Sequence, residues 1–302
     1  DLEQQILDLK DSDLDENSIQ QEVIRLNESI MKTTEKIYSN LSPWQNVQVA
    51  RHPERPHFLD YVERITDDFD ELHGDRHFSD DRAVLGGIGT IGEYKVMLIG
   101  HEKGRSTEEK ISHNFGMSQP EGYRKACRLM ELAERFSLPI VTLVDTPGAY
   151  PGIDSEERGQ SEAIAHNLLV MSSLKTPIIV NVVGEGGSGG ALALGVGDHI
   201  TMLEHSTYSV ASPEACASIV WRDSTKADQA AEAMKLNAES ILELGLIDEI
   251  IPEPLGGAHR SFDQASANLS KSILKSLDEL AKQPINSILE KRYERLMSYG
   301  SI

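Results

Sequence analysis

The chain has 302 residues, 39% of them hydrophobic and 26% charged, and its formal net charge is -20 at pH 7. This length allows one large α/β domain with an extension, and the composition is ordinary for a globular protein. Because so negative a chain repels phosphate groups, we expect this chain to bind neither nucleic acid nor an anionic membrane surface.

The two cysteines, Cys127 and Cys216, lie far apart and lack the C-x-x-C spacing of a zinc ribbon or a redox pair. We expect both to be small buried side chains, and we expect no metal in this chain. The first residues are acidic and polar, and no apolar run approaches the ~18 residues of a membrane span, which predicts a cytoplasmic location. Because the chain starts with aspartate, we expect the initiator and a few leading residues to be missing.

Near the N-terminus, apolar residues recur on one helical face, and a shorter segment before them has the same pattern. The residues of the longer segment are Ile19, Val23, Leu26, Ile30 and Ile37. Ser18 and Gln21 have the spacing of a capping box at its start. Residues 1–50 are therefore predicted to form a helical arm, which packs either on its own domain or on another subunit.

A small basic cluster follows, formed by Arg51, His52, Arg55 and His57. Two prolines hold this segment extended, so the two guanidinium groups can converge on a phosphate-bearing ligand. Ordinary solvated surface charge is the alternative interpretation.

The pattern of the core begins with two strand-like runs around a glycine turn in residues 83–104, as expected of a hairpin. Helical and strand patterns then alternate, which predicts a parallel sheet buried on both faces. The alternating segments are a helix over 122–136, a strand over 139–145, a helix over 159–174 and a strand over 177–183. Functional residues are expected in the loops that follow the strands.

The rest of the chain continues with shorter patterned segments. They are a helix of small residues over 190–198, a strand over 199–210, and mostly helical segments over 221–254 and 266–283. We therefore expect a core domain over residues 51–255 and a C-terminal helical segment over 256–302.

The stretch GEGGSGGALALGVGD, which begins at Gly184, fits three different chemistries. Gly184, Gly186 and Gly189 form G-x-G-x-x-G, and Glu204 follows at the distance of a ribose-binding acid. This pattern is typical of a dinucleotide site in an NAD-binding oxidoreductase. Such a fingerprint normally opens its domain, however, whereas this one follows two earlier strand and helix units.

The same stretch contains G-x-S-x-G around Ser188, with Asp248 and His259 later in the order of an α/β-hydrolase triad. A nucleophile elbow is a tight turn directly after a strand, and four residues separate Val183 from Ser188. On that spacing Ser188 is expected to cap the following helix instead.

The third chemistry needs only backbone groups. The first N–H groups of a helix lack internal partners, so the amides of Gly189 and Gly190 can hold an oxygen that gains negative charge. Each such donor is worth on the order of 3 kcal/mol to a transition state. Tight packing of small residues against the sheet is the structural alternative, and this stretch alone does not decide between them.

A second glycine and proline turn, DTPGAYPG, covers residues 145–152 at the end of the preceding strand. Together with IGHEKGRS, EERGQSEAIA, GEGGSGGALA and STYSVASPE, it closely resembles the carboxyltransferase α subunits of bacterial acetyl-coenzyme A carboxylase, members of the crotonase superfamily. The resemblance runs from about Val23 to Ser301 and includes RHPERP, NFGMSQPEGYRKA, IIPEPLGGAHR and RLMSYG. It implies an α/β crotonase (ClpP/crotonase-like) spiral ββα fold with an N-terminal helical arm.

The resemblance also implies an activity and partners. Such subunits transfer a carboxyl group from carboxybiotin, carried on the biotin carboxyl carrier protein, to acetyl-coenzyme A, giving malonyl-coenzyme A for fatty acid biosynthesis. They are active only with a zinc-ribbon β subunit in an α2β2 heterotetramer, and biotin carboxylase completes the holoenzyme. Biotin would not be attached to this chain. An NAD-binding oxidoreductase and a noncatalytic scaffold subunit remain the alternatives.

The resemblance assigns roles to particular residues. The backbone of Gly189 and Gly190 would form the oxyanion hole for biotin. The biotin side of the site would be lined by Gly148, Ala149, Tyr150, Gly186 and Gly187. Candidates for steering the anionic substrates are Lys103, Arg105, Arg51 and Arg55.

Overall fold

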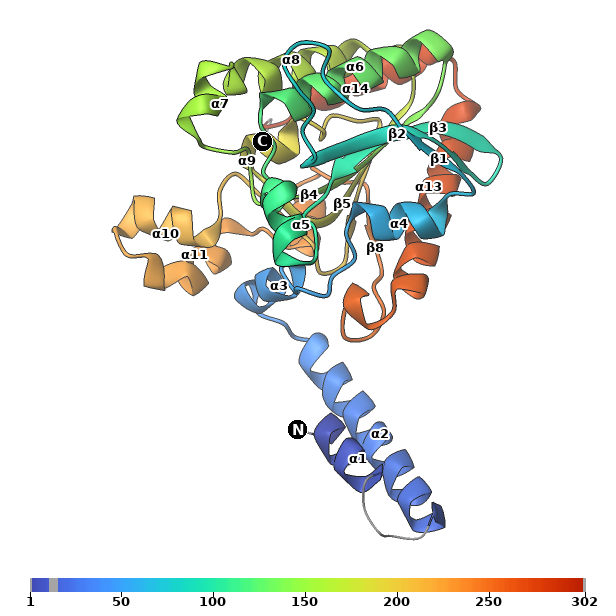
Figure 1. Ribbon diagram of the computed structural model, residues 1–302, viewed down its shortest axis with the longest axis vertical. Helices are drawn as coiled ribbons and strands as arrows, with labels where there is room; N and C mark the ends of the chain where they lie inside the picture. The colour runs from blue at the N-terminus through green and yellow to red at the C-terminus, as the bar shows by residue number, and fades with distance from the viewer. Residues whose placement is uncertain (1, 11–15, 301–302) are drawn as a thin grey trace. The chain divides into compact units, whose positions relative to one another are not determined.

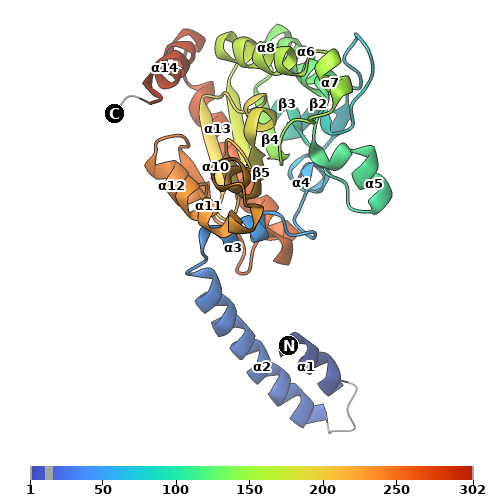
Figure 2. The ribbon, with the colours of Figure 1, turned by 90° about the vertical axis from the view of Figure 1, so that its left-hand side faces the viewer.

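The computed structural model describes residues 2–10 and 16–300, and their contacts group the chain into two units, Asp1–Ser42 and Pro43–Ile302. In the first unit, helix α1 (Leu2–Lys10) lies beside helix α2 (Glu16–Tyr38), as Figure 2 shows. Because α2 already begins at Glu16, Ser18 lies inside its first turn, and the predicted capping box is wrong. The domain boundaries at residues 50 and 255 stay predictions.

Within the second unit, the described residues form one eight-stranded sheet in the order β1-β2-β3-β4-β5-β6-β8, with β7 beside the end of β5 (Figure 1). The pairs β1·β2 and β2·β3 are antiparallel, and the other pairs are parallel. The strands are β1 Phe69–Glu71, β2 Val84–Ile91, β3 Tyr94–His101, β4 Ile140–Thr146, β5 Ile178–Gly187, β6 His199–Leu203, β7 Thr207–Ser209 and β8 Glu249–Ile251. The predicted hairpin and parallel sheet are confirmed.

The central strand β4 illustrates why the sheet forms. Every residue of its sequence IVTLVDT is buried, and it lies between β3 and β5. A strand covered on both faces favours a continuous run of β-branched and aliphatic residues, because each side chain enters a core. The carboxyl ends of β3, β4 and β5 therefore meet at one edge of the sheet, where their loops lie close together.

Helices cover both faces of the sheet. Helices α6 and α8 pack on one face, in a cluster that includes Leu129 and Met171, and α4 and α13 pack on the other, in a cluster that includes Phe58 and Leu277 (Figure 1). The α-helices are α3 Pro43–Ala50, α4 Phe58–Ile65, α5 Thr107–Ser112, α6 Pro120–Phe136, α7 Ile153–Glu157, α8 Gln160–Ser173, α9 Ser188–Leu192, α10 Pro213–Trp221, α11 Ala227–Met234, α12 Ala238–Glu243, α13 Phe262–Ala281 and α14 Ile285–Ser298. In residues 2–10 and 16–300, no helix is long and apolar enough to cross a membrane.

Four predicted elements differ in the structure. The strand expected to stop at Val183 continues to Gly187, because its last residues pair with β7. The small-residue helix predicted over 190–198 is the five-residue α9, which begins earlier and ends at Leu192. The segment 221–254 contains strand β8, and the single strand predicted over 199–210 is divided into β6 and β7.

Candidate active site

Two glycine-rich turns meet at the carboxyl edge of the sheet, one after β4 and one after β5. A Cβ atom on Gly190 would lie 2.7 Å from the carbonyl carbon of Gly148 and 2.8 Å from the nitrogen of Ala149. A Cβ atom on Gly187 would lie 2.2 Å from the carbonyl oxygen of Pro147. Such distances leave no room for a side chain, so glycine at these positions allows the two backbones to approach. The two turns therefore form one continuous surface.

The backbone donors at this surface divide into bonded and unbonded groups. The N–H of Gly148 donates to Thr146 Oγ1 at 3.1 Å, and that of Tyr150 donates to the Ser118 carbonyl at 3.0 Å. For the N–H groups of Ala149, Gly189 and Gly190, we find no acceptor among the residues that the structure describes. Because α9 is so short, its dipole is small, and the oxyanion chemistry rests on these donors themselves.

Ser188 occupies a strained turn. It follows directly after β5 with a φ of +51°, a left-handed conformation that is uncommon for a residue with a side chain. This is the strand-to-helix placement of a nucleophile elbow, which the spacing after Val183 had argued against. The N-cap of α9 is Gly187, so the prediction that Ser188 caps this helix is wrong.

The other members of the candidate triad lie elsewhere. Asp248 precedes β8 at the amino edge of the parallel strands, where it accepts hydrogen bonds from the Ile200 N–H and from Arg295, each at 2.7 Å. The ring of His259 stacks on His52, with the ring centroids 3.8 Å apart. Ser188 therefore has neither Asp248 nor His259 as a partner, and the hydrolase hypothesis lacks its triad.

The described residues of the dinucleotide pattern do not form a nucleotide-binding turn either. Gly184 and Gly186 lie inside strand β5 instead of a phosphate-binding turn. The carboxylate of Glu204 accepts a hydrogen bond from the Glu253 N–H at 3.0 Å. The helix that would orient the phosphates has only five residues. The fingerprint of a dinucleotide fold therefore reflects close packing of β5 here.

A buried network of charges lies beneath the two turns. Lys103 Nζ lies 2.6 Å from Asp145 Oδ1 and 3.0 Å from Glu185 Oε2, and Arg51 lies 2.6 Å from both Glu185 and Glu214. Burial disfavours the charged ammonium and alone would lower the pKa of Lys103. The negative charges of Asp145 and Glu185 have the larger combined effect, so the pKa is raised. Carboxylates pair with both cations, and the steering of anionic substrates by Lys103 and Arg51 stays a prediction.

The two other predicted steering residues are also engaged. Arg55 is 1% exposed, donates to both carboxylate oxygens of Glu253, and donates to the Val183 carbonyl at 2.8 Å. Arg105 pairs with Asp60, and its guanidinium carbon lies 5.2 Å from the ring centroid of Phe262. Both arginines therefore hold segments of the fold together, and their role in steering substrates stays a prediction.

The predicted biotin-side residues divide into an accessible and an inaccessible group. Gly186 and Gly187 are buried in β5 and pair with Tyr208 and Ser209 of β7, so they do not line the outer surface. Gly148 is buried between the turns, whereas Ala149 and Tyr150 are partly exposed. The biotin-side role of all five residues stays a prediction, and Ala149 and Tyr150 are the more accessible candidates.

Two buried residues that hold the turns in place, Asp145 and His101, were not predicted from the sequence. Asp145 accepts a hydrogen bond from the Glu185 N–H at 2.9 Å, which ties the end of β4 to the end of β5. His101 is buried against the backbone of Gly190, and its burial lowers the pKa of the imidazole to about 4, so the ring is neutral at pH 7. The available signal was a titratable residue inside or directly after an otherwise apolar strand.

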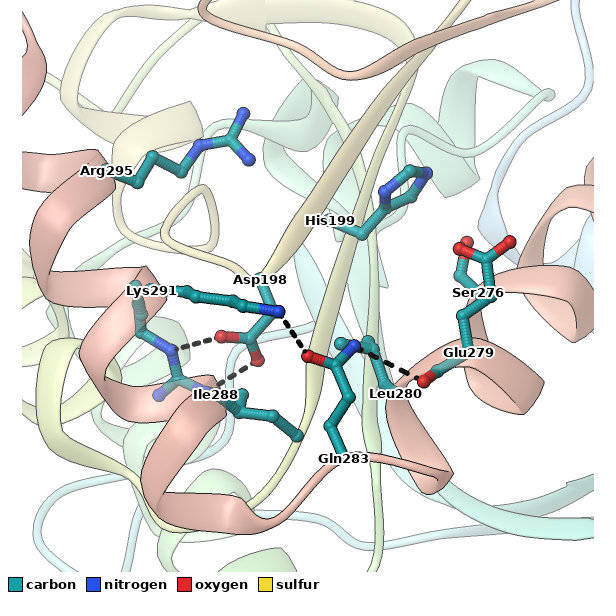
Figure 3. A pocket seen from close by; sticks show the side chains of 10 residues that line it. Asp198, His199, Ser276, Glu279, Leu280, Gln283, Ile288, Lys291 and Arg295 are labelled. Carbon is teal, nitrogen blue, oxygen red and sulfur yellow. Dashed lines mark hydrogen bonds and ion pairs between the residues drawn. The ribbon is translucent and has the colours of Figure 1, made fainter.

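A second charged pocket, of about 240 Å³, lies at the opposite, amino edge of the sheet (Figure 3). Arg292 is buried there and donates to both carboxylate oxygens of Asp198 and to the carbonyls of Met171, Leu174 and Thr176. Every donor of this guanidinium is used within the chain. The hydrogen bonds of Arg292 therefore hold α14 against the sheet.

The chain matches a family of known proteins over almost its whole length. Residues 1–300 match the family model described as acetyl co-enzyme A carboxylase carboxyltransferase-like. The chain is 59% identical to the acetyl-coenzyme A carboxylase carboxyl transferase subunit alpha of Teredinibacter turnerae, over 98% of this chain and 93% of that protein. It is 57% identical to the protein of the same name in Methylococcus capsulatus, over 99% of this chain and 94% of that protein.

Solved structures share the fold at low sequence identity. The core of transcarboxylase 12S superposes with a TM-score of 0.62 at 18% identity, covering 78% of this chain and 44% of that chain. A subunit of a Pseudomonas malonate decarboxylase hetero-tetramer superposes with a TM-score of 0.63 at 16% identity, covering 80% and 94%. These similarities confirm the predicted crotonase-like α/β fold. With the sequence matches, they establish that the chain belongs to the acetyl-coenzyme A carboxylase carboxyltransferase family of transferases.

Proposed function

We propose that this chain is the α subunit of the carboxyltransferase component of acetyl-coenzyme A carboxylase. It would transfer a carboxyl group from carboxybiotin to acetyl-coenzyme A and give malonyl-coenzyme A. The observation that carries this proposal is the set of unbonded N–H groups of Ala149, Gly189 and Gly190 where the two turns meet. The names of the two relatives described above support the same activity.

The donors fit an acceptor such as the ureido oxygen of biotin. Ala149 and Gly189 are partly exposed, so a ligand oxygen can reach this surface, and adjacent amides can share one oxygen that gains charge. Carboxybiotin, when bound, supplies both the carboxyl group and the base. Gly189 and Gly190 would therefore stabilise negative charge, and Ser188 would act neither as a nucleophile nor as a base.

The surrounding residues would hold these donors in place before the substrate arrives. Asp145 forms an ion pair with Lys103 and accepts a hydrogen bond from the Glu185 N–H. These two contacts hold the end of β5 in place. Gln160 donates to the carbonyls of Ser118 and Tyr150 at 2.8 and 2.9 Å, which fixes the turn after β4. Donors that need no reorganisation stabilise a transition state more than a substrate.

The partners belong to the same proposal. A β subunit with a zinc ribbon would complete the site in an α2β2 heterotetramer, with the biotin carboxyl carrier protein and biotin carboxylase as further partners in the cytoplasm. Exposed apolar side chains near the turns support a covering subunit. Ile153, directly after the first turn, is 81% exposed, and Val210, directly after the strand that pairs with the end of β5, is 82% exposed. Large exposed apolar side chains that cluster near a site are typical of protein interfaces.

The test is reconstitution. The purified chain alone should be inactive, and addition of the β subunit should produce carboxyl transfer from malonyl-coenzyme A to biotin, the reverse reaction. Activity of the isolated chain would contradict the proposed division of the site. A noncatalytic scaffold, the competing hypothesis, requires that changes at Gly189 leave the activity of the assembled complex unaltered.

A further inference from the structure

Helices α6 and α8 bring together three side chains that are good metal ligands. Cys127 and Glu131 lie one turn apart on α6, and His166 lies on α8, which packs beside α6 (Figure 1). Their donor atoms, a sulfur, a carboxylate oxygen and an imidazole nitrogen, all lie within 4.8 Å of one another. None of these residues has a role in the proposed transferase site.

The spacing suits a tetrahedral ion. With Zn–S and Zn–N distances of roughly 2.3 and 2.05 Å, neighbouring ligand atoms of such a site are about 3.5 Å apart. Small side-chain rotations on the two helices therefore suffice to close the cluster. Glu162 lies one turn before His166 on α8, so each helix presents a pair of donors four residues apart on one face.

The surroundings favour a cation. The cluster lines a cavity of about 530 Å³, together with Glu162 and Asn167. Asn167 Oδ1 is buried without a hydrogen-bond partner, so a polar atom at this cavity is unsatisfied. Glu131 and Glu162 both line the cavity, and their carboxylates add negative charge to its wall.

Three arginines that line the same cavity have partners outside the cluster. Arg76 donates to the His73 carbonyl at 2.7 Å. Arg124 pairs with Asp75 and Glu121, at 2.9 and 2.7 Å. Arg128 donates to the carbonyls of Leu72, His73 and Gly74. Their guanidinium groups are thus directed at other partners, and Cys127, Glu131 and His166 remain as the set of ligands for a cation.

We propose that Cys127, Glu131 and His166 bind a borderline-soft divalent cation of the Zn²⁺ type, with Glu162 or water as the fourth ligand. A thiolate and an imidazole select Zn²⁺ or Co²⁺ over Mg²⁺ and Ca²⁺, which prefer oxygen ligands. The ion would link α6 to α8. Its role is structural, because α8 carries Gln160 and Ile164, which support the turns of the active site.

The test uses the isolated full-length chain, so that no zinc of a partner contributes and the result does not depend on transferase activity. Titration with Co²⁺ should give about one equivalent bound, with the thiolate-to-metal absorption and intense visible bands of a tetrahedral Co²⁺ site. Zn²⁺ should displace the Co²⁺ and raise the unfolding temperature of the chain.

Three variants decide whether the ion sits at this cluster. Cys127→Ser and His166→Gln should each weaken Co²⁺ binding by more than about 100-fold, since even loss of an outer hydrogen-bond partner of a ligand costs about 10- to 100-fold. Cys216→Ser removes the other cysteine of the sequence and should change nothing. The proposal fails if the wild-type chain binds no Co²⁺, or if the spectrum survives in both cluster variants.

Discussion

The two edges of the sheet are both polar, but they differ in how completely their polar groups are bonded. At the amino edge, all N–H donors of Arg292 are used by Asp198 and by backbone carbonyls of the chain. At the carboxyl edge, the N–H groups of Ala149, Gly189 and Gly190 have no acceptor within the described residues. Satisfied groups stabilise a fold, whereas donors held in place without an acceptor are available to a ligand.

The comparison also explains why charge alone is a poor guide to the site. The predicted steering residues are charged, yet Arg55 and Lys103 lie in ion pairs that resemble the pair of Arg292 and Asp198. Changes at these ion pairs should therefore affect stability first. Changes at the unbonded amides should affect turnover first.

The largest expected effect on stability is at the amino edge. Arg292→Met leaves Asp198 buried without its partner and should lower the free energy of unfolding by about 3–5 kcal/mol. Urea denaturation measures the loss, and the folded fraction should keep its activity with the β subunit. Lys291→Met is the control, because Lys291 makes only an exposed hydrogen bond to Gln283, and it should change stability by less than about 0.5 kcal/mol. Equal effects of the two variants would contradict a structural role for Arg292.

Loss of a cation from the charged network beneath the turns should lower stability somewhat less than loss of Arg292. Lys103→Met removes one partner of Asp145 and Glu185, but Glu185 keeps Arg51, so we expect a loss of about 3 kcal/mol. Lys95→Met, an exposed position on β3, is the control for loss of a lysine charge. If Lys103→Met left stability intact and only weakened substrate binding, Lys103 would be a steering residue after all.

Lowering the pH should reduce the stability of the fold, because His101 is buried in its neutral form. The unfolded chain binds a proton at this residue near pH 6.5, whereas burial lowers the pKa of the native imidazole to about 4. Between these values the unfolded state binds more protons, so stability present above pH 6.5 is lost as the pH falls toward 4, by on the order of 3 kcal/mol. His101→Asn should flatten this part of the curve of unfolding free energy against pH. An unchanged slope would show that His101 has the same pKa in the native and the unfolded chain.

The smallest expected effect is that of Ser188→Ala. Ser188 has a strained backbone but no triad partners, so kcat/KM of the assembled complex should fall by less than about 3-fold. A nucleophilic serine would instead lose activity by about 10⁴-fold or more. A loss of that size would restore the hydrolase interpretation of G-x-S-x-G.

Much of the fold could be predicted because its signals are local. The apolar runs of β4 and β5 and the helical period of α6 and α8 depend on residues near one another in sequence, and the structure contains all four. The end of β5 depends instead on β7, which holds Gly186 and Gly187 extended although two glycines favour a turn. Helix α9 therefore begins only after Gly187.

The site could be predicted only in part for the same reason. The meeting of two glycine turns follows from their places after neighbouring parallel strands. Whether a basic residue is free depends on distant carboxylates, and Arg55 and Glu253 are 198 residues apart in sequence. Loops that approach each other too closely to admit a side chain likewise leave no trace in a one-dimensional pattern beyond the presence of glycine.

The central claim is that a backbone N–H at position 189 stabilises negative charge during carboxyl transfer. Gly189→Ala keeps this donor, and its Cβ would meet Ile164 only at an ordinary contact distance of 3.4 Å. Gly189→Pro removes the donor at the second position of α9, where a helix tolerates proline. The direct test is kcat/KM of the two variants, each assembled with the β subunit and matched for unfolding temperature. We predict a loss of about 100-fold or more for proline and only a few-fold for alanine, whereas equal activities would contradict the claim.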